Sequence, residues 1–454
     1  MNEPAVHAPL DLQIRANTPG AVTAGRSFLD GRSVVLVRAD HPERRGALTV
    51  EDGTTIAAAA ELALTKRLPL VLLIASSGAD AGEGVGALDG WGRAARLIAR
   101  CSGDIPILAG VTGPAVSGTA LLIGLADIVV MADDAYAFVN GPNPVREMTG
   151  ITVSIDELGG SDIHARSTGV ATAVVPTDEV LNTLSTILSF LPNHVDEPAP
   201  RISTNDPVDR ATPEAGELLP AAATGSYDVR DVLRVLVDDD YFFELRTSWA
   251  PNIVTGFATV AGRPVGIVAN QPLAMAGTLD IPASQKGARF VAMCDAFNLP
   301  LITLVDTPGF YPGKDLEWRG MIRHGAQLAF AYARATVPRI CVVLRKSYGG
   351  AYIVMDSKTI GNDVYFAWPT AELAVMGANQ AAQILRRGAD QEEVDKFVFE
   401  YEETYLNPYV AAERGYVDAV INPAETRSEL VNTLMLLETK REPLPRRRHD
   451  NSPL

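Results

Sequence analysis

The stretch "DGRSVVLV" (residues 30–37) returns later in the chain as "AGRPVGIV" (261–268), at an offset of 231 positions. At the same offset, "LPLVLLI" (68–74) lies over "LPLITLV" (299–305) without a gap. Glycines fall in register as well, in the pairs Gly31 with Gly262, Gly46 with Gly277 and Gly78 with Gly309. Glycine and proline specify backbone geometry, so their shared spacing points to a shared backbone. A repeat of this length predicts one architecture built twice.

Both copies show the same order of elements. A β-run and a Gly-bearing turn lead into an Ala-rich helix, "TTIAAAAELALTK" (54–66) or "SQKGARFVAMCDAF" (284–297), and a continuous apolar strand follows. This alternation predicts βαβ units around a largely parallel sheet. We therefore expect an α/β protein with two duplicated domains, 1–200 and 226–454. The segment 201–225, rich in Pro, Asp and Ala, is expected to be the linker.

Composition excludes several classes of function. The 454 residues are 47% hydrophobic and 21% charged, which is typical of a folded α/β protein. The net charge of −16 argues against general binding to nucleic acid or an anionic membrane. The three cysteines are far apart, so we expect neither a disulfide framework nor an all-cysteine zinc site. The N-terminal sequence shows neither the basic region nor the apolar region of a signal peptide. The apolar stretches are too short or interrupted to span a bilayer, so we expect a cytoplasmic protein.

The turn in "RKSYGGAYIVM" (345–355) has two interpretations. It follows "RICVVL", which reads as a buried strand, and it precedes a segment that could open a helix. Two glycines there suit an ordinary tight turn. They also suit a bare backbone corner whose N–H groups approach a ligand atom. The local sequence leaves both open.

Longer motifs carry a family resemblance. The segments 265–313, 320–358 ("GMIRHGAQLAFAYARATVPRICVVLRKSYGGAYIVMDSK") and 365–382 ("YFAWPTAELAVMGANQAA") resemble the carboxyltransferase (β) subunits of biotin-dependent acyl-CoA carboxylases. The resemblance continues more loosely through "GVTGPAVSGTALLIGLADIVVM" (110–131) and "FVNGPNPVREMTG" (138–150). It implies two crotonase-like spiral domains. It also implies a ring-shaped hexamer with active sites between the N domain of one protomer and the C domain of another.

The resemblance implies a reaction as well: transfer of carboxylate from carboxybiotin to the α-carbon of acetyl-CoA or propionyl-CoA, giving malonyl-CoA or methylmalonyl-CoA. Both the thioester enolate and the ureido carbonyl of biotin carry negative charge, so two sets of backbone N–H donors are expected. In the family mechanism the biotin nitrogen takes the α-proton, so no side-chain base and no metal are required. The chain has no "MKM"-type biotin-attachment motif, which implies a separate biotin carboxylase/biotin carboxyl carrier subunit.

Site residues are carried over from the family motifs. The resemblance implies that the N–H groups of Gly350 and Ala351 bind the biotin carbonyl, and that Ser117 and Gly118 cradle the thioester oxygen. The domain 1–200 thus becomes the acyl-CoA side and 226–454 the biotin side. Four further residues are expected to bind the substrate: Ile353, Gly78, Gly46 and Gly141. Five are expected to bind biotin: Gly349, Tyr348, Gly309, Phe310 and Gly277.

Several of these residues have plainer readings. Ile353 either helps to set acyl-chain length or is simply core, and the loop 306–313 is either a biotin-pocket wall or an ordinary loop. His324 and His164 read as structural histidines. The first copy also departs from the family, with Asp80 where an Arg is usual and "VSG" (116–118) where "AGG" is usual.

These departures from the family pattern are also compatible with other functions. An anion at Asp80 would disfavour ordinary CoA binding, so the chain could be a carboxyltransferase or decarboxylase of specialised metabolism acting on an unusual thioester. A non-catalytic β-like subunit that assembles with an active paralogue is the alternative from another class. A single-domain hydratase or isomerase of crotonase type fits less well.

Overall fold

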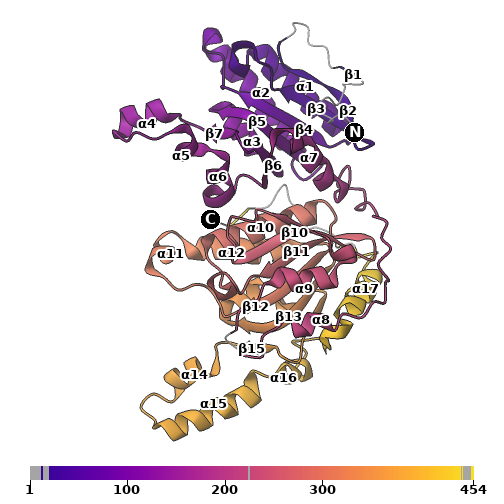
Figure 1. The fold of residues 1–454 in the computed structure, drawn as a ribbon, viewed down its shortest axis with the longest axis vertical. Helices are drawn as coiled ribbons and strands as arrows, with labels where there is room; N and C mark the ends of the chain where they lie inside the picture. Colours follow the sequence, from indigo (N-terminus) through magenta and orange to yellow (C-terminus); the bar gives the residue numbers. More distant parts are fainter. Residues whose placement is uncertain (1–11, 14–19, 223–224, 441, 443–450, 454) are drawn as a thin grey trace. The chain divides into compact units, whose positions relative to one another are not determined.

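The computed structural model describes residues 12–13, 20–222, 225–440, 442 and 451–453. The chain divides into two compact units, Met1–Pro200 (unit 1) and Arg201–Leu454 (unit 2), each with its own sheet and helices (Figure 1). Most of the N-terminal stretch, in which we expect no signal peptide, lies outside the described residues. No described helix combines the length and the apolar character that crossing a membrane would require.

Unit 1 is built on one sheet with the strand order β1-β2-β3-β4-β5-β6-β8, and β7 pairs with β5. The first three strands are antiparallel, and every pairing from β3 onward is parallel. The strands are β1 Leu12–Gln13, β2 Thr23–Leu29, β3 Arg32–Ala39, β4 Leu70–Ser76, β5 Ile107–Val116, β6 Ile128–Ala132, β7 Tyr136–Phe138 and β8 Ala173–Val175. The helices are α1 Val50–Lys66, α2 Val85–Cys101, α3 Gly118–Ile123, α4 Pro142–Thr149, α5 Ile155–Gly159, α6 Ser161–Ile163 and α7 Val180–Ser189.

Unit 2 repeats this topology. Its order is β9-β10-β11-β12-β13-β14-β16 with β15 on β13, again antiparallel for the first three strands and parallel afterwards. The strands are β9 Phe242–Leu245, β10 Ile253–Val260, β11 Arg263–Asn270, β12 Leu301–Thr307, β13 Arg339–Tyr348, β14 Val364–Ala367, β15 Glu372–Ala374 and β16 Ala419–Val420. The helices are α8 Glu214–Glu217, α9 Val229–Leu236, α10 Ile281–Ala296, α11 Lys314–Trp318, α12 Met321–Arg334, α13 Gly349–Val354, α14 Ala378–Leu385, α15 Gln391–Tyr405, α16 Pro408–Glu413 and α17 Thr426–Leu436.

The repeated glycines explain how the same backbone arises twice. Gly46 and Gly277 both have positive φ, +72° and +73°. A Cβ on Gly46 would lie 2.2 Å from the Ala75 carbonyl oxygen, and one on Gly277 would lie 2.5 Å from that of Asp306. Only glycine tolerates both the conformation and the close approach. The turn after each third strand is therefore fixed by sequence against the end of the next strand.

Central strands of both sheets are buried along all or nearly all of their length. In β12 every residue is buried, and in β4 all but one are. This agrees with the continuous apolar runs "LPLITLV" and "LPLVLLI", because parallel strands are covered on both faces. The helices start on matched caps: Thr49 caps α1 and Asp280 caps α10, again 231 positions apart.

The segment expected as a linker packs on unit 2 up to residue 222. The Thr212 N–H donates to the Ala424 carbonyl at 2.9 Å, and Ala215 is fully buried in the core of that unit. Asp206 accepts from Arg210 at 2.7 Å and lies 3.4 Å from the buried guanidinium of Arg427. These contacts place residues 201–222 in unit 2.

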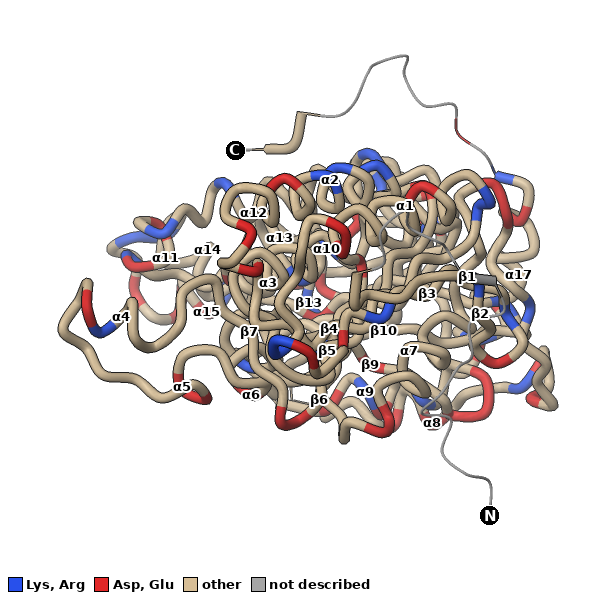
Figure 2. The backbone as a smooth tube through the Cα atoms, turned by 90° about the horizontal axis from the view of Figure 1, so that it is seen from above, with Lys and Arg blue, Asp and Glu red and all other residues tan. Residues whose placement is uncertain are grey.

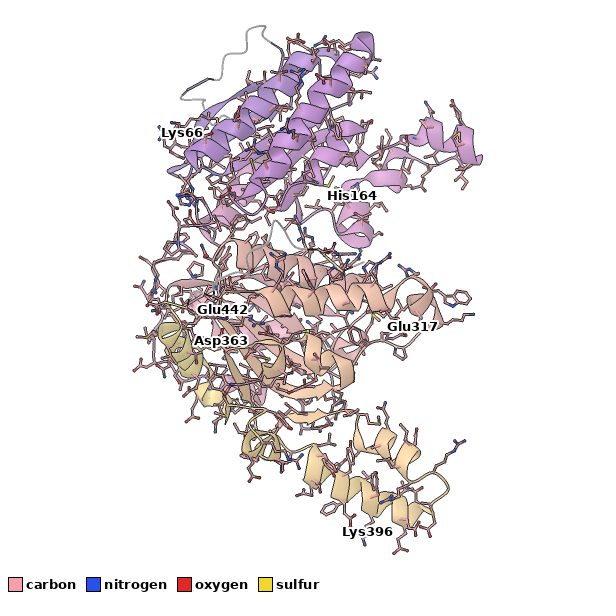
Figure 3. All side chains as sticks on the ribbon, turned by 180° about the vertical axis from the view of Figure 1, so that it is seen from behind. Lys66, His164, Glu317, Asp363, Lys396 and Glu442 are labelled. Atoms are coloured by element: carbon pink, nitrogen blue, oxygen red, sulfur yellow. The ribbon has the colours of Figure 1, made fainter. Side chains whose placement is uncertain are left out.

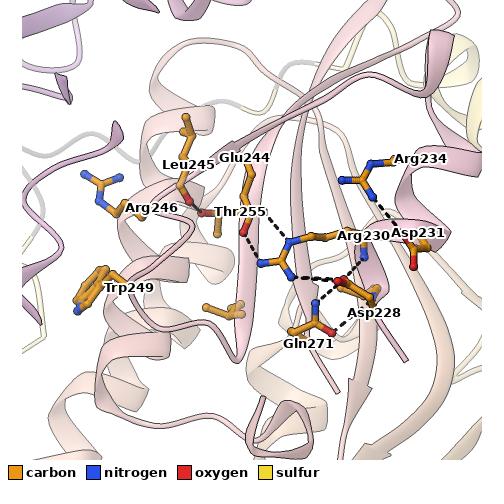
Figure 4. A network of polar contacts seen from close by, with 12 residues as sticks. Asp228, Arg230, Asp231, Arg234, Glu244, Leu245, Arg246, Trp249, Thr255 and Gln271 are labelled. Atoms are coloured by element: carbon orange, nitrogen blue, oxygen red, sulfur yellow. Dashed lines mark hydrogen bonds and ion pairs between the residues drawn. The ribbon is translucent and has the colours of Figure 1, made fainter. Parts of the chain in front are cut away.

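A polar network ties α9 to the sheet of unit 2 (Figure 4). Arg230 on α9 donates to both carboxylate oxygens of Glu244 on β9, at 2.7 and 2.9 Å. Asp228, the N-cap of α9, accepts from Gln271 at 2.6 Å, and Gln271 in turn accepts the Val229 N–H at 3.3 Å. Because the charges are paired side by side, the half-buried Arg230 satisfies its donors within unit 2.

Charges are mixed along the chain. Figure 2 shows Lys and Arg interspersed with Asp and Glu along the backbone tube of both units. Together with the net charge of −16, this distribution offers no extended basic stripe along the described chain of the kind that nucleic acid binding uses.

Candidate active site

The glycine turn in "RKSYGGAYIVM" lies where β13 passes into α13. Gly349 has a φ of +60°, and α13 begins at that residue. In the described part of the chain, no protein acceptor is recorded for the N–H groups of Gly350 and Ala351. The first N–H groups of a helix have no partner within the helix, so this turn presents two adjacent donors.

A cavity of about 610 Å³ opens beside this turn in unit 2. Gly349, Gly350 and Ile353 line it, and Ile353 is 48% exposed. The plainer reading of Ile353 as core does not agree with that exposure. The rest of the wall is aliphatic or aromatic except for Thr359 and Arg414, and comprises Tyr352, Leu373, Ala374, Val375, Tyr401, Tyr405, Val410, Ala411 and Tyr416.

Of the other residues expected to bind biotin, Phe310 and Gly309 lie beside the turn, Tyr348 precedes it, and none of them lines that cavity. The Phe310 ring lies against Gly350, 3.3 Å from where a Cβ on Gly350 would be. Gly309 has a φ of +133°, and its carbonyl accepts the Leu279 N–H at 3.0 Å. Tyr348 is buried and its hydroxyl donates to Glu372. Gly277 lies in its own tight turn, against the carbonyl of Asp306.

The first copy has the same kind of turn between β5 and α3. Ser117 takes a φ of +57°, close to that of Gly349. Its N–H donates to the Phe138 carbonyl at 2.9 Å, so this donor is already used. Among the described residues, the N–H groups of Gly118 and Thr119 donate to no protein acceptor. The pair expected at Ser117 and Gly118 therefore moves by one residue.

This shift makes the two turns equivalent. In unit 1, Leu70 of β4 pairs with Ile107 of β5, and in unit 2, Leu301 of β12 pairs with Arg339 of β13. The residue numbers of the two units therefore differ by 231 between β4 and β12, and by 232 between β5 and β13. At an offset of 232, Gly118 and Thr119 correspond to Gly350 and Ala351. Each half of the chain thus contributes one pair of matched donors.

A smaller cavity, about 180 Å³, lies beside the first turn. Three residues expected at the thioester site, Gly78, Ser117 and Gly118, line it. Gly46 and Gly141 do not: Gly46 lies in its turn against Ala75, and Gly141 is the N-cap of α4. The remaining wall is Leu48, Ala79, Ala87, Leu88, Trp91, Thr119 and Leu121.

A buried carboxylate fixes the strand ends beneath the second turn. The Asp306 side chain accepts from Arg345 Nε at 3.0 Å, from the Tyr227 hydroxyl at 2.9 Å and from the Lys346 N–H at 3.2 Å. Burial raises the pKa of the Asp306 carboxyl, and the Arg345 guanidinium opposes that shift. Asp306 occupies a register shift between β12 and β13, so it holds the two strands together just before Gly349.

A second buried ion pair lies behind α13. Arg339 Nη1 lies 3.0 Å from Asp356 Oδ1, and both side chains are almost fully buried. Asn362 donates to the other oxygen of Asp356 at 2.7 Å. Burial raises the pKa of Asp356 to about 6, against the favourable charge of Arg339. Because Asp356 stands two residues after Val354, the last residue of α13, this pair fixes the chain just beyond the helix that carries Gly350.

The rings of His164 and His324 are both hydrogen-bonded to neighbouring groups. His164, labelled in Figure 3, has Nε2 2.8 Å from the Ala137 carbonyl and Nδ1 2.9 Å from the Thr168 hydroxyl. His324 Nδ1 lies 3.2 Å from Gln285 Nε2 and 3.1 Å from Gln327 Oε1. Both rings therefore bond within their own surroundings. Among the described residues, no group of three or more His, Cys, Asp or Glu is arranged to hold a metal ion.

Asp80 is less unfavourable for CoA binding than its negative charge alone suggests. Its carboxylate lies 2.9 Å from Arg44 and accepts the Gly82 N–H at 2.8 Å. The sequence alone indicated an added anion near a CoA site, whereas the structure pairs Asp80 with a cation from the turn before α1. The anion is partly neutralised at its own position.

Sequence reasoning missed the aromatic walls of both cavities. Tyr401 and Tyr405 lie four residues apart on α15 with ring centroids 5.0 Å apart. That i,i+4 spacing in "YEETY" was a readable signal for a shared helix face. Trp91 on α2 gave no such signal, because nothing local to it indicates that it reaches the Gly118 turn.

The carboxyl transferase domain model matches residues 9–452. The chain belongs to the carboxyl transferase family. It is 42% identical over 446 residues to the propionyl-CoA carboxylase carboxyltransferase subunit of Haloferax mediterranei, with 96% of this chain and 86% of that protein covered. The biotin-dependent acetyl-/propionyl-coenzyme A carboxylase beta5 subunit of Mycobacterium tuberculosis is 42% identical over 452 residues, covering 95% and 82%.

Structural comparison agrees with this membership. A crystal structure of transcarboxylase 12S matches with a TM-score of 0.93 at 40% identity, covering 95% of this chain and 85% of that one. The resemblance and the duplicated α/β fold expected from sequence are therefore confirmed. The chain is a carboxyltransferase of the propionyl-CoA carboxylase family, and the choice among acyl groups is not fixed by this membership.

One departure from the family pattern predicts a change in stability. Ser117 holds a φ of +57° and a ψ of −118°, a region that suits glycine. We expect Ser117→Gly to relieve the strain and raise the unfolding free energy of this carboxyltransferase by about 1 kcal/mol, after the entropy cost of a new glycine. Thermal unfolding with Ser102→Gly, at a negative φ of −58°, as the control measures this. A lower midpoint for Ser117→Gly would contradict the strain.

Proposed function

We propose that this chain moves carboxylate from carboxybiotin to the α-carbon of a short acyl-CoA, acetyl-CoA or propionyl-CoA. One observation carries the proposal. Each half of the duplicated chain presents two adjacent backbone N–H groups at the start of a short helix, Gly118 with Thr119 and Gly350 with Ala351, and each pair adjoins a cavity.

The reaction needs two such pairs. When the thioester loses its α-proton, negative charge develops on the thioester oxygen, and when biotin gives up the carboxyl group, charge develops on its ureido oxygen. Preorganised N–H donors stabilise such charges most where water is excluded. We assign Gly118 and Thr119 to the thioester oxygen and Gly350 and Ala351 to the ureido oxygen.

The residues of unit 2 fit biotin. The cavity beside Gly350, about 610 Å³, falls within the usual size of small-molecule sites and is mostly aliphatic and aromatic. Apolar walls suit the fused rings and side chain of biotin, and the N–H pair suits its ureido oxygen. When bound, biotin supplies the activated carboxyl group.

The walls of the two cavities also fit a reaction without a side-chain base. Among the described residues that line them, the only ionisable groups are Arg414 and the tyrosines Tyr352, Tyr401, Tyr405 and Tyr416. Burial raises the pKa of Tyr352, which keeps its hydroxyl protonated near neutral pH. The chain's own task is then to bind, to orient and to stabilise charge.

The relatives support a proposal about the partners of this chain. The M. tuberculosis relative is named as biotin-dependent, and transcarboxylase 12S assembles as a hexamer, with methylmalonyl-CoA bound intact or hydrolysed in its crystal structures. We propose that this chain likewise forms a hexamer and receives carboxybiotin from a separate biotin carboxylase/biotin carboxyl carrier subunit. Sedimentation of the purified chain tests the hexamer, and co-purification tests the partner.

The activity can be tested without the partner. We expect the purified protein to decarboxylate malonyl-CoA or methylmalonyl-CoA when free biotin is added, because the half-reaction then runs backwards through both sites. The control is 2-iminobiotin, which lacks the ureido oxygen and should not support the reaction. Absence of biotin-dependent decarboxylation with every short malonyl-type thioester would contradict the proposal and would favour a non-catalytic subunit.

Ile353 gives a test of substrate choice. Its side chain lines the apolar cavity beside the biotin-side donors, and aspartate is smaller than isoleucine, so Ile353→Asp would leave room for the additional methyl group of methylmalonyl-CoA. We expect Ile353→Asp to shift preference from malonyl-CoA towards methylmalonyl-CoA by about 10-fold in kcat/KM, the scale of one methylene in a fitted pocket. Ile353→Val is the apolar control. An unchanged ratio for Ile353→Asp would remove Ile353 from the site.

A further inference from the structure

An aromatic ring covers the corner glycine in each half of the chain. A Cβ on Gly118 would lie 2.8 Å from Trp91 Cδ1, and one on Gly350 would lie 3.3 Å from Phe310 Cε2. A Cβ would collide with the ring at Gly118 and would make a tight contact with it at Gly350. The two halves therefore solve the same packing problem at the same point of the fold.

The rings come from different elements. Phe310 forms a parallel bridge with Leu279, and the matching bridge in unit 1 joins Leu48 to Ala79. Ala79 is thus the counterpart of Phe310, and it has no ring to offer. In unit 1 the ring is supplied instead by Trp91 on α2. The space in front of Ala79 stays open, and Ala79 and Trp91 both line the 180 Å³ cavity.

Trp91 also holds the backbone of the donors. Its indole N–H donates to the Gly118 carbonyl at 2.7 Å. That carbonyl and the Thr119 N–H belong to one planar trans peptide, in which they point in opposite directions. Fixing the carbonyl therefore fixes the direction of the Thr119 N–H, one of the two donors of the first turn.

Resting on the proposed function, we propose that Trp91 is a positioning and specificity-determining residue of the thioester site. Its indole N–H sets the direction of the Thr119 donor, and its ring, opposite Ala79, bounds a cavity that takes a short acyl chain. Phe310 does the equivalent packing at the second turn but fills the space that Ala79 leaves open at the first.

Two variants separate the two roles. Trp91→Phe keeps a ring and removes the N–H, so the Thr119 donor loses its alignment. We expect kcat for biotin-dependent methylmalonyl-CoA decarboxylation to fall about 10-fold with KM within about 2-fold, since misplacement of a reacting group acts on the transition state. Ala79→Leu keeps Trp91 and fills the cavity. We expect it to weaken propionyl-CoA binding at least about 10-fold while the binding of free CoA, which has no acyl chain, is unchanged.

The control for the tryptophan change is Trp318→Phe, at a position that is 77% exposed. It should leave kcat, KM and both titrations unchanged. The inference is overturned if Trp91→Phe keeps kcat within about 2-fold or lowers it no more than Trp318→Phe does. It is also overturned if Ala79→Leu leaves propionyl-CoA binding unchanged. If Trp91→Phe does not fold, the Ala79→Leu titration decides.

The same titration separates this inference from the proposed function. A wild-type protein with no decarboxylation of any malonyl-type thioester would contradict the function. Calorimetric titration with propionyl-CoA and free CoA would then still test whether the cavity binds the acyl chain. Tighter binding of propionyl-CoA than of free CoA, lost in Ala79→Leu, supports the inference. No difference between the two ligands for the wild-type protein overturns it.

Discussion

Gly350→Pro is expected to lower biotin-dependent decarboxylation about 100- to 1000-fold, the usual cost of losing one oxyanion donor. Proline has no backbone N–H, so the donor pair at Gly350 and Ala351 loses its first member. The fold should persist, because Gly350 lies in the first turn of α13 and is not among the glycines with positive φ. Proline is well tolerated at such positions. Steady-state turnover with methylmalonyl-CoA and free biotin measures the effect.

Gly350→Ala is the matched control. It adds the same Cβ, 3.3 Å from Phe310 Cε2, but keeps the N–H. We expect it to retain at least about a tenth of the wild-type turnover, since a tight contact costs less than a lost donor. Equal losses in the two variants would show that packing against Phe310, and not the N–H group, is what the turn requires.

Arg339→Met is expected to give the largest loss of stability. It removes the partner of Asp356, whose side chain is fully buried, and leaves that charge unpaired at a cost of about 3–5 kcal/mol. For a unit of this size the cost corresponds to a fall of about 6–20 °C in the midpoint of unfolding of unit 2. Scanning calorimetry of the purified protein measures it.

The double variant Arg339→Met/Asp356→Asn tests the reason for this loss. Asparagine keeps the shape of Asp356 and tolerates its positive φ of +59° without a charge. We expect the double variant to recover most of the midpoint, because a buried pair replaced on both sides is close to neutral. A double variant as unstable as Arg339→Met would mean that the lost bonds of Arg339 to the Tyr332 and Gly361 carbonyls dominate.

The fold was readable from sequence because the repeat specifies backbone geometry directly. Gly46 and Gly277 stand where a Cβ would strike the end of the next strand, so their presence in both copies follows from close packing. The apolar runs gave the central strands, since parallel strands are buried on both faces. The prolines and charges of the segment 201–225 suggested a linker, and their pattern gave no sign that Thr212 and Ala215 pack in unit 2.

The site was readable only in part. Motif resemblance pointed to both glycine turns, but it could not show that the Ser117 N–H is used by Phe138, because that bond depends on the pairing of β5 with β7. Nor could it show the Trp91 ring at Gly118, which depends on how α2 packs over the turn. Buried charges such as Asp306 and Asp356 are also set by tertiary packing, and their neighbours along the chain give no sign of it.

The most direct test of the two-donor account is a crystal structure of the protein with biotin and a short acyl-CoA bound. The account predicts the ureido oxygen of biotin about 2.7–3.1 Å from the backbone nitrogens of Gly350 and Ala351, and the thioester oxygen at the same distance from those of Gly118 and Thr119. Ligand oxygens bound by side chains instead, with these four N–H groups turned to protein carbonyls, would contradict it.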